Sequence, residues 1–143
     1  MQSPQTPRCA LPVRVYYQDT DAGGVVFHAQ YLAFMERART ELLNEAGIDL
    51  AQLAESTGTI FFVHDIAIRY HRPALLNERL TVTAEVATMR RASFLFRQRV
   101  ERDGTLLAEA DVQVATVHRG TRKPVRMPAA LVRAFGTVAS GGA

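Results

Sequence analysis

Residues 19–42 read DTDAGGVVFHAQYLAFMERARTEL, and the arrangement of the rest of the chain follows from them. Two carboxylates, Asp19 and Asp21, stand one residue apart, before the pair Gly23-Gly24. His28 follows, directly before a long helical pattern. A helix start carries unpaired backbone amides and the positive end of the helix dipole, so it can stabilise an anion or a developing oxyanion. The stretch therefore indicates a reactive carboxylate beside a helix start, in a site suited to attack on a carbonyl group.

Apolar residues recur at spacings of three and four from residue 30 to residue 46, which predicts one amphipathic helix over that range. The residues on this apolar face are Tyr31, Phe34, Met35, Ala38, Leu42 and Ala46. Gly47 provides a natural stop at the C-terminal end of the helix. We expect this helix to be buried against the rest of the domain.

Alternating apolar residues predict five strands. Their ranges are 13–18, 60–71, 79–88, 93–101 and 107–118. In the second of these strands, the pattern places Phe62, Ile66, Ile68 and Tyr70 on one side. The turns between the later strands are short, and Asp103-Gly104 is a strong hairpin signal, so we expect antiparallel pairing. Shorter helices are expected over 49–55 and 129–135.

These elements predict an α+β fold in two layers, with the helix on one face of the sheet. The other face keeps the polar residues Arg97, Arg99, Glu109, Asp111 and Gln113, so it should meet water or a partner subunit. We expect a single domain over 13–136, a flexible N-terminal leader over 1–12 and a loose tail over 137–143. Two strands would remain open at the sheet edges, and pairing with a second copy would cover one of them.

Composition and charge exclude several classes of function. The chain has 143 residues, a length that fits one domain with a single core. Its net charge of +3 comes from dispersed basic residues, which fits a partner carrying phosphates and argues against nucleic acid. No apolar run approaches the roughly 20 residues of a membrane span. Cys9 is the sole cysteine, so no internal disulfide can form. We expect a cytoplasmic protein.

Three segments carry a resemblance to a known family. They are residues 13–43, VRVYYQDTDAGGVVFHAQYLAFMERARTELL, the YHRPA segment at 70–74 and the late pair Lys123-Pro124. Together they closely resemble the Tol-Pal-associated acyl-CoA thioesterases of the YbgC type. That group belongs to the 4-hydroxybenzoyl-CoA thioesterase branch of the hotdog-fold enzymes. The resemblance implies one long central helix wrapped by a five-stranded antiparallel sheet. It also implies a homodimer or homotetramer with active sites at the subunit interface.

The reaction that the resemblance implies is hydrolysis of an acyl-CoA thioester to a carboxylic acid and free CoA. CoA is then part of the substrate, and no cofactor is needed. No metal site is expected either, because His64, His71 and His118 lack the spacing of metal ligands. An acyl carrier protein is a further possible partner by the same resemblance.

The resemblance assigns the catalytic role to Asp21, the second carboxylate of the pair. This carboxylate could attack the thioester carbonyl directly or deprotonate a water, and both mechanisms stay open. We expect Asp19 to fix the loop instead. His28 matches the histidine of the family block, so its backbone N–H is a candidate oxyanion donor and its ring could assist the leaving sulfur. Gly24 would let the backbone approach the ligand closely, and Tyr17 would line the site.

The phosphates of CoA require arginine or lysine partners. The candidates are Arg90 and Arg91, with Ser93 beside them at the turn between two predicted strands. A later basic cluster, residues Arg122, Lys123 and Arg126, is a second possibility. A turn of this composition could also be no more than a solvated basic surface.

Two other functions fit the same pattern. A non-catalytic acyl-CoA or acyl-carrier binding protein, acting as a scaffold of the envelope machinery, would bind its ligand without turnover. A hotdog dehydratase would use a histidine with a carboxylate to remove a β-hydroxyl group. The intact Asp21–His28 block argues against the binding protein, since a pure binder has no need of a placed carboxylate. Survival of activity after loss of Asp21 would favour the dehydratase.

Overall fold

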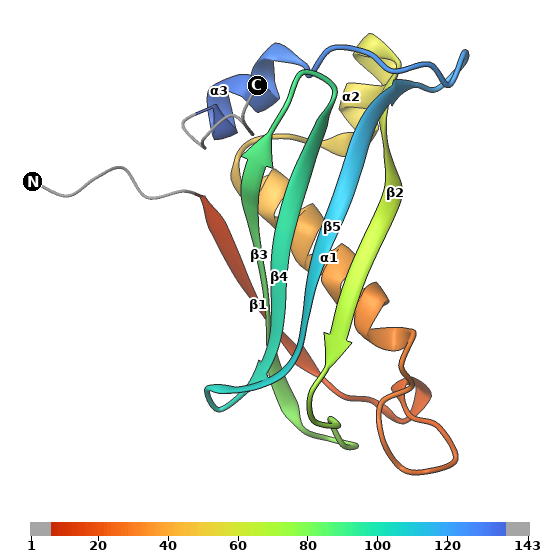
Figure 1. Ribbon diagram of the computed structural model, residues 1–143, viewed down its shortest axis with the longest axis vertical. Coiled ribbons are helices and arrows are strands. Elements are labelled where there is room, and N and C mark those ends of the chain that lie inside the picture. The colour runs from red at the N-terminus through yellow and green to blue at the C-terminus, as the bar shows by residue number, and fades with distance from the viewer. Residues whose placement is uncertain (1–6, 137–143) are drawn as a thin grey trace, which may run out of the picture.

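The computed structural model describes residues 7–136, which form a five-stranded antiparallel sheet and three helices (Figure 1). The strands are β1 (Arg8–Arg14), β2 (Thr59–Tyr70), β3 (Arg79–Met89), β4 (Ser93–Arg102) and β5 (Thr105–His118), in the sheet order β1-β3-β4-β5-β2. The helices are α1 (Gln30–Glu45), α2 (Leu50–Thr57) and α3 (Ala129–Phe135), with one 3-10 turn, η1 (Tyr17–Asp19). The predicted α+β class and antiparallel sheet are confirmed, and α2 and α3 lie where the two shorter helices were expected. With three helices present, the single central helix that the resemblance implied is not confirmed. None of these helices is long and apolar enough to cross a membrane.

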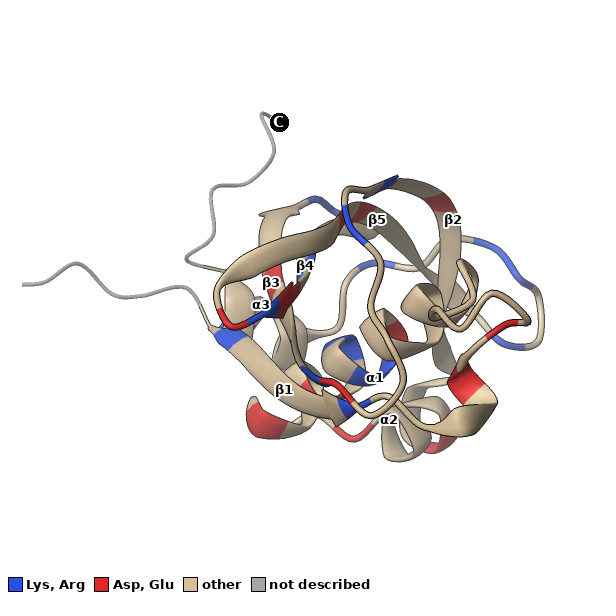
Figure 2. Ribbon diagram, turned by 90° about the horizontal axis from the view of Figure 1, so that it is seen from below, with Lys and Arg blue, Asp and Glu red and all other residues tan. Residues whose placement is uncertain are grey.

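The sheet curves around α1, whose apolar face supplies the centre of the core (Figure 2). The buried residues of α1 are Tyr31, Phe34, Met35, Ala38, Leu42 and Leu43. Five of the six predicted residues are buried and Leu43 joins them, whereas Ala46 follows the end of the helix and is only partly buried. The helix ends where Gly47 adopts a φ of +83°, a conformation that favours glycine. The helical pattern in the sequence therefore located the helix to within one residue.

A buried amide links α1 to the sheet. Gln98, on the inner face of β4, donates from Nε2 to the carbonyl of Met35 at 2.9 Å and to that of Thr83 at 3.2 Å. Its Oε1 accepts a hydrogen bond from Nη1 of Arg39 at 2.9 Å. Because every polar atom of this buried amide has a partner, it fixes the position of the helix without the cost of an unsatisfied group.

The N-terminal boundary of the domain differs from the prediction. Strand β1 pairs with β3 from Arg8 to Arg14, so the expected leader over 1–12 is wrong for residues 8–12. The expected strand over 13–18 likewise begins and ends earlier. Pro12 suggested a lead-in, but β1 lies at the edge of the sheet, where a residue without an N–H group is tolerated. The rest of the leader, residues 1–6, and the expected tail over 137–143 lie outside the described residues.

A β-bulge in β2 corrects the predicted side-chain pattern. The register shifts between Val63 and Asp65, which inserts one residue into the strand. Residues Val63 and Ile66 lie opposite the buried residues Val114 and Val112 of β5, respectively. Phe62 therefore points to the outer face, not to the side of Ile66 as predicted. Strict alternation fails at a bulge, because one extra residue moves every preceding side chain to the other face.

The hairpin between β4 and β5 follows the prediction. Asp103 and Gly104 both have positive φ angles, +50° and +80°. A two-residue turn of this kind matches the twist of antiparallel strands, and aspartate followed by glycine tolerates it well. On the outer face beyond this turn, Arg97 of β4 pairs with Asp111 of β5 at 3.3 Å.

Candidate active site

The loop between η1 and α1 is a small closed hairpin. The N–H of Phe27 donates to the carbonyl of Asp19 at 2.9 Å, and the N–H of Asp21 donates to the carbonyl of Val25 at 2.9 Å. Gly24 closes the tip with a φ of +80°, and its N–H reaches the carbonyl of Asp21 at 3.0 Å. The left-handed conformation explains the glycine at position 24, since other residues adopt it at a cost. The loop therefore presents the Asp21 side chain on a defined turn.

Asp19 anchors this loop from inside. Its side chain is 4% exposed, and Oδ2 accepts the N–H of Tyr16 at 2.7 Å. Oδ1 accepts a hydrogen bond from Nε2 of Gln30 at 2.9 Å. One carboxylate thus ties the start of the loop to the first residue of α1, which agrees with the expectation that Asp19 fixes the loop.

Asp21 has a different environment. The residue is exposed, and its Oδ1 accepts the N–H of Gly23 at 2.8 Å, as in an Asx turn. Within residues 7–136, Oδ2 has no hydrogen-bond partner. A Cβ atom on Gly23 would lie 3.2 Å from Oδ1, so this glycine keeps the space beside the carboxylate open. The structure leaves one carboxylate oxygen facing solvent in a fixed orientation, and the catalytic role of Asp21 remains a prediction.

His28 lies where the loop enters α1. The N–H of Gln30 donates to the carbonyl of Phe27 at 2.8 Å, whereas the amides of His28 and Ala29 have no partner in the described part of the chain. No side chain caps the helix at Ala29. The exposed imidazole of His28 packs on the ring of Phe27, with centroids 4.4 Å apart. The start of α1 therefore offers free N–H donors next to the Asp21 loop.

The YHRPA segment at 70–74 supports this helix start from the other side. The Tyr70 hydroxyl donates to the carbonyl of His28 at 2.7 Å. The amide of Ala74 donates to the hydroxyl of Tyr31 at 3.0 Å, and its carbonyl accepts the N–H of Val26 at 2.9 Å. The sequence singled out this segment as a motif but gave it no role. Its contacts show that it holds the loop and the helix start together.

The structure does not bring the predicted phosphate contacts to this loop within one chain. Arg90, Arg91 and Ser93 follow the far end of β3, whose first residue, Arg79, pairs with Arg14 beside η1. Eleven residues of strand separate the two ends by roughly 35 Å. Tyr17 is 82% exposed and lies in η1, two residues before Asp19, so it remains near the loop.

Arg90 and Arg91 instead line a basic cavity of about 710 Å³. Its walls are Arg90, Arg91, Arg126, Met127, Ala129, Val132 and Arg133. The N–H of Met127 donates to the carbonyl of Arg91 at 2.7 Å, which joins the turn after β3 to the segment before α3. Ser93, Arg122 and Lys123 are not among the lining residues. Arg133 was not predicted, since only its place on α3 brings it to the turn.

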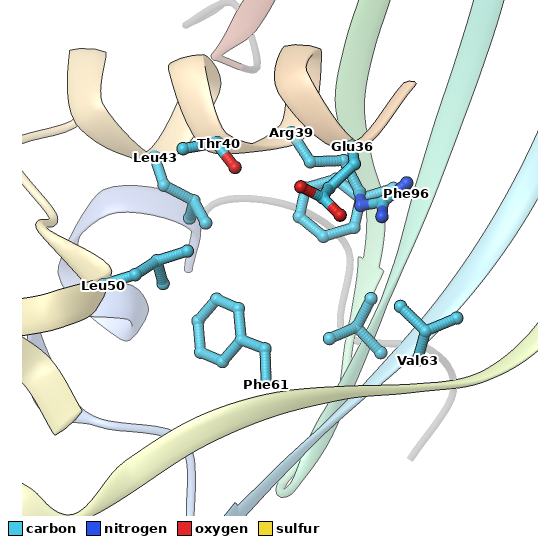
Figure 3. A pocket seen from close by; sticks show the side chains of 9 residues that line it. Glu36, Arg39, Thr40, Leu43, Leu50, Phe61, Val63 and Phe96 are labelled. Atoms are coloured by element: carbon cyan, nitrogen blue, oxygen red, sulfur yellow. The ribbon is translucent and has the colours of Figure 1, made fainter. Parts of the chain in front are cut away.

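A second cavity, of about 220 Å³, lies between α1 and β2 (Figure 3). Its lining is mostly apolar, with Leu43, Leu50, Phe61, Val63, Phe96 and Val114 beside Glu36, Arg39 and Thr40. Burial lowers the pKa of Arg39, although Glu36 opposes this shift. The guanidinium lies 6.0 Å from the centre of the Phe96 ring. The cavity can therefore accept an apolar group with few polar contacts.

Two of the three histidines considered as metal ligands, His71 and His118, contact other groups. Nε2 of His71 lies 2.7 Å from Oε2 of Glu109, and Nδ1 of His118 accepts the N–H of Gly120 at 3.0 Å. Over residues 7–136, no three His, Cys, Asp or Glu side chains cluster in a way that could hold a metal ion.

Comparisons with known proteins find relatives that match almost the whole chain. The profile of the "Thioesterase-like superfamily" matches residues 15–135. The "Acyl-CoA thioesterase YbgC" of Haemophilus influenzae is 46% identical over 126 residues, which cover 88% of this chain and 93% of that protein. The "Acyl-CoA thioester hydrolase YbgC" of Escherichia coli is 45% identical, with coverages of 87% and 92%. The crystal structure of a probable thioesterase from Bartonella henselae superposes with a TM-score of 0.81 at 33% identity, covering 85% of this chain and 99% of that one.

The two loop carboxylates should respond differently to the same isosteric change. Asp19→Asn replaces one buried acceptor by a donor, so we expect a loss of about 1–3 kcal/mol in the free energy of unfolding. Asp21→Asn changes an exposed group and should stay within about 0.5 kcal/mol of wild type. Urea denaturation of the two variants measures both. Equal losses would contradict the assignment of Asp19 as the anchor of the loop.

Proposed function

The chain belongs to the thioesterase-like superfamily, and on that premise we propose that it hydrolyses acyl-CoA thioesters to a carboxylic acid and free CoA. The observation that carries the proposal is the exposed carboxylate of Asp21 beside an uncapped helix start. This pair supplies a base or nucleophile and a set of oxyanion donors, which are the two requirements for attack on a thioester. Acyl-CoA is the substrate in this proposal, and CoA leaves as the thiol, with no cofactor.

The thioester carbonyl oxygen would accept hydrogen bonds from the free amides at the start of α1, and the carbonyl carbon would face Asp21. In one route, Asp21 takes a proton from water, the hydroxide adds to the carbonyl, and the tetrahedral intermediate expels the CoA thiolate. In the other, Asp21 adds to the carbonyl and expels the thiolate, and water then cleaves the resulting anhydride. The thiolate gains a proton in either case, and we assign its delivery to the exposed ring of His28.

We propose that the basic cavity binds the phosphates of CoA. Four of the residues that line the cavity are arginines, which provide charge-assisted donors for phosphate oxygens. The cavity lies at the opposite end of the sheet from the Asp21 loop of the same chain. We therefore propose that one active site combines the Asp21 loop of one subunit with the basic cavity of another. Ser93 and Tyr17 remain candidate contacts at the two ends of such a substrate. CoA thioesters are made and used in the cytoplasm, and we propose that location for the reaction.

The edges of the sheet favour a homodimer formed through β2. Strand β2 is a long edge strand that exposes Phe62, Val63, Ile66 and Tyr70. The opposite edge, β1, is shorter, includes Pro12 and exposes Arg8 and Arg14, features that discourage pairing. A second copy on β2 would cover the apolar edge and enclose the cavity between α1 and β2, which we assign to the acyl chain. Two such dimers could pair again through the polar face of the sheet.

Replacement of the catalytic carboxylate tests the reaction directly. Asp21→Asn should lower the rate of thiol release from acyl-CoA by at least about a hundredfold, because a neutral amide is neither a base nor a nucleophile. Asp103→Asn, at the β4–β5 turn, is the matched control and should retain the wild-type rate. Free-thiol release from short, long and aromatic acyl-CoAs is the measurement. Binding without turnover by the wild type would favour a scaffold protein, and an active Asp21→Asn would remove Asp21 from the mechanism.

The basic cavity should matter for binding more than for chemistry. Arg91→Ala is expected to raise the KM for acyl-CoA about tenfold with kcat within twofold, since one charge-assisted contact is lost. Arg119→Ala removes another exposed arginine, which lies 3.8 Å from the carboxylate of Glu55 and does not line the cavity, and it should leave both constants unchanged. Steady-state kinetics separate the two effects. An unchanged KM in Arg91→Ala would overturn this assignment.

The oligomeric state follows from the exposed edge. Light scattering should give a mass of at least twice the 15.8 kDa of one chain. Ile66→Lys places a charge on the apolar edge of β2 and should shift the protein toward the monomer with loss of thiol release. A wild-type monomer with full activity would rule out an active site shared between subunits.

A further inference from the structure

Tyr70 is joined to the helix start across 42 residues of sequence. Its hydroxyl donates to the carbonyl of His28 at 2.7 Å, and its ring packs edge-on against Tyr31, with centroids 5.4 Å apart. Tyr31 is in turn fixed by the Ala74 amide, 3.0 Å from its hydroxyl. Two tyrosine hydroxyls therefore connect the first turn of α1 to the end of β2 and the segment after it.

The carbonyl that Tyr70 holds belongs to a peptide whose N–H is unpaired. The C=O of His28 and the N–H of Ala29 share one planar trans peptide and point in opposite directions. A hydrogen bond on the carbonyl therefore fixes the direction of this N–H and increases its polarity as a donor. A tyrosine hydroxyl is protonated at neutral pH and able to donate, and burial raises the pKa of Tyr70 further in that direction.

We propose that Tyr70 is a positioning residue of the thioesterase reaction, which orients the Ala29 amide as a donor to the thioester oxygen by holding the carbonyl of His28. The inference rests on the proposed function. It adds Ala29 to His28 as a source of oxyanion stabilisation and gives the YHRPA motif a mechanistic role. Tyr70 itself does not touch the reacting atoms in this arrangement.

A merely structural hydroxyl would behave differently from a positioning one. Loss of a structural hydrogen bond lowers stability without a selective effect on the transition state. Loss of a positioning bond lowers kcat while KM stays constant, because the donor stabilises charge that develops only during reaction. Thr57 supplies the comparison, since its hydroxyl lies at the end of α2 and makes structural contacts only. Its oxygen lies 2.8 Å from the carbonyl of Leu53 and 2.8 Å from Oγ1 of Thr59, and it accepts the N–H of Thr59 at 3.2 Å.

The test compares Tyr70→Phe with Thr57→Val in the full chain. Tyr70→Phe keeps the ring that packs on Tyr31 and removes one hydroxyl. We expect its kcat for thiol release from acyl-CoA to fall about tenfold with KM within twofold, a smaller effect than the hundredfold or more seen on removal of an oxyanion donor itself. Thr57→Val should lower Tm at least as much, because its hydroxyl has more contacts, and should keep a wild-type kcat.

A second readout is independent of activity. The amide proton of Ala29 should shift upfield in the ¹H–¹⁵N spectrum of Tyr70→Phe and stay in place in Thr57→Val, because the bond on the shared peptide is lost in the first variant alone.

An unchanged kcat in Tyr70→Phe would overturn the proposal, as would an unchanged Ala29 resonance. Failure of Tyr70→Phe to fold would also overturn it, since the hydroxyl would then be a structural requirement. A wild type without thioesterase activity would refute the proposed function instead, and the Ala29 resonance would still report the coupling.

Discussion

The buried carboxylate of Asp19 is the constraint on which the site depends. Its two oxygens hold the Tyr16 amide and the Gln30 side chain, so the chain before the loop and the helix after it keep one spacing. Between these anchors the loop closes on its own backbone bonds and presents Asp21 outward. Asp19 and Asp21, two residues apart, thus carry the same chemical group in opposite environments. Burial and hydrogen bonding assign Asp19 to structure, whereas exposure leaves Asp21 available for chemistry.

The rest of the fold places the helix start within reach of this loop. The inner face of the sheet positions α1 through apolar packing and the Gln98 amide, and the end of β2 reaches the first turn through Tyr70. Neither contact is local in sequence, so the free amides at the start of α1 have their direction set by the whole domain. Strand β2 is an open edge of the sheet, and a cavity lies between it and α1. This arrangement leaves room for a substrate chain in the cavity and for a second subunit on the edge.

Local patterns predicted much of this arrangement. The period of the helix located α1, and Asp103-Gly104 located the β4–β5 turn, because each signal depends on a few neighbouring residues. The errors arose where distant partners decide the outcome. Pairing with β3 makes residues 8–12 a strand despite Pro12, and the bulge before Asp65 turns Phe62 outward. The block at 19–28 identified Asp21 and His28 as candidates from sequence alone. Two contacts could not be predicted in this way, because only the folded chain brings the residues together. Arg133 joins Arg90 and Arg91 at one cavity, and Tyr70 reaches His28.

The most direct test of the account is a crystal structure with an acyl-CoA analogue in which a methylene group replaces the thioester sulfur. Such a ketone cannot be hydrolysed and keeps the carbonyl in place. The account predicts its oxygen at about 2.7–3.2 Å from the amide nitrogen of His28 or Ala29, with the Asp21 carboxylate facing the carbonyl carbon. A carbonyl bound away from the start of α1, or turned from Asp21, would contradict it.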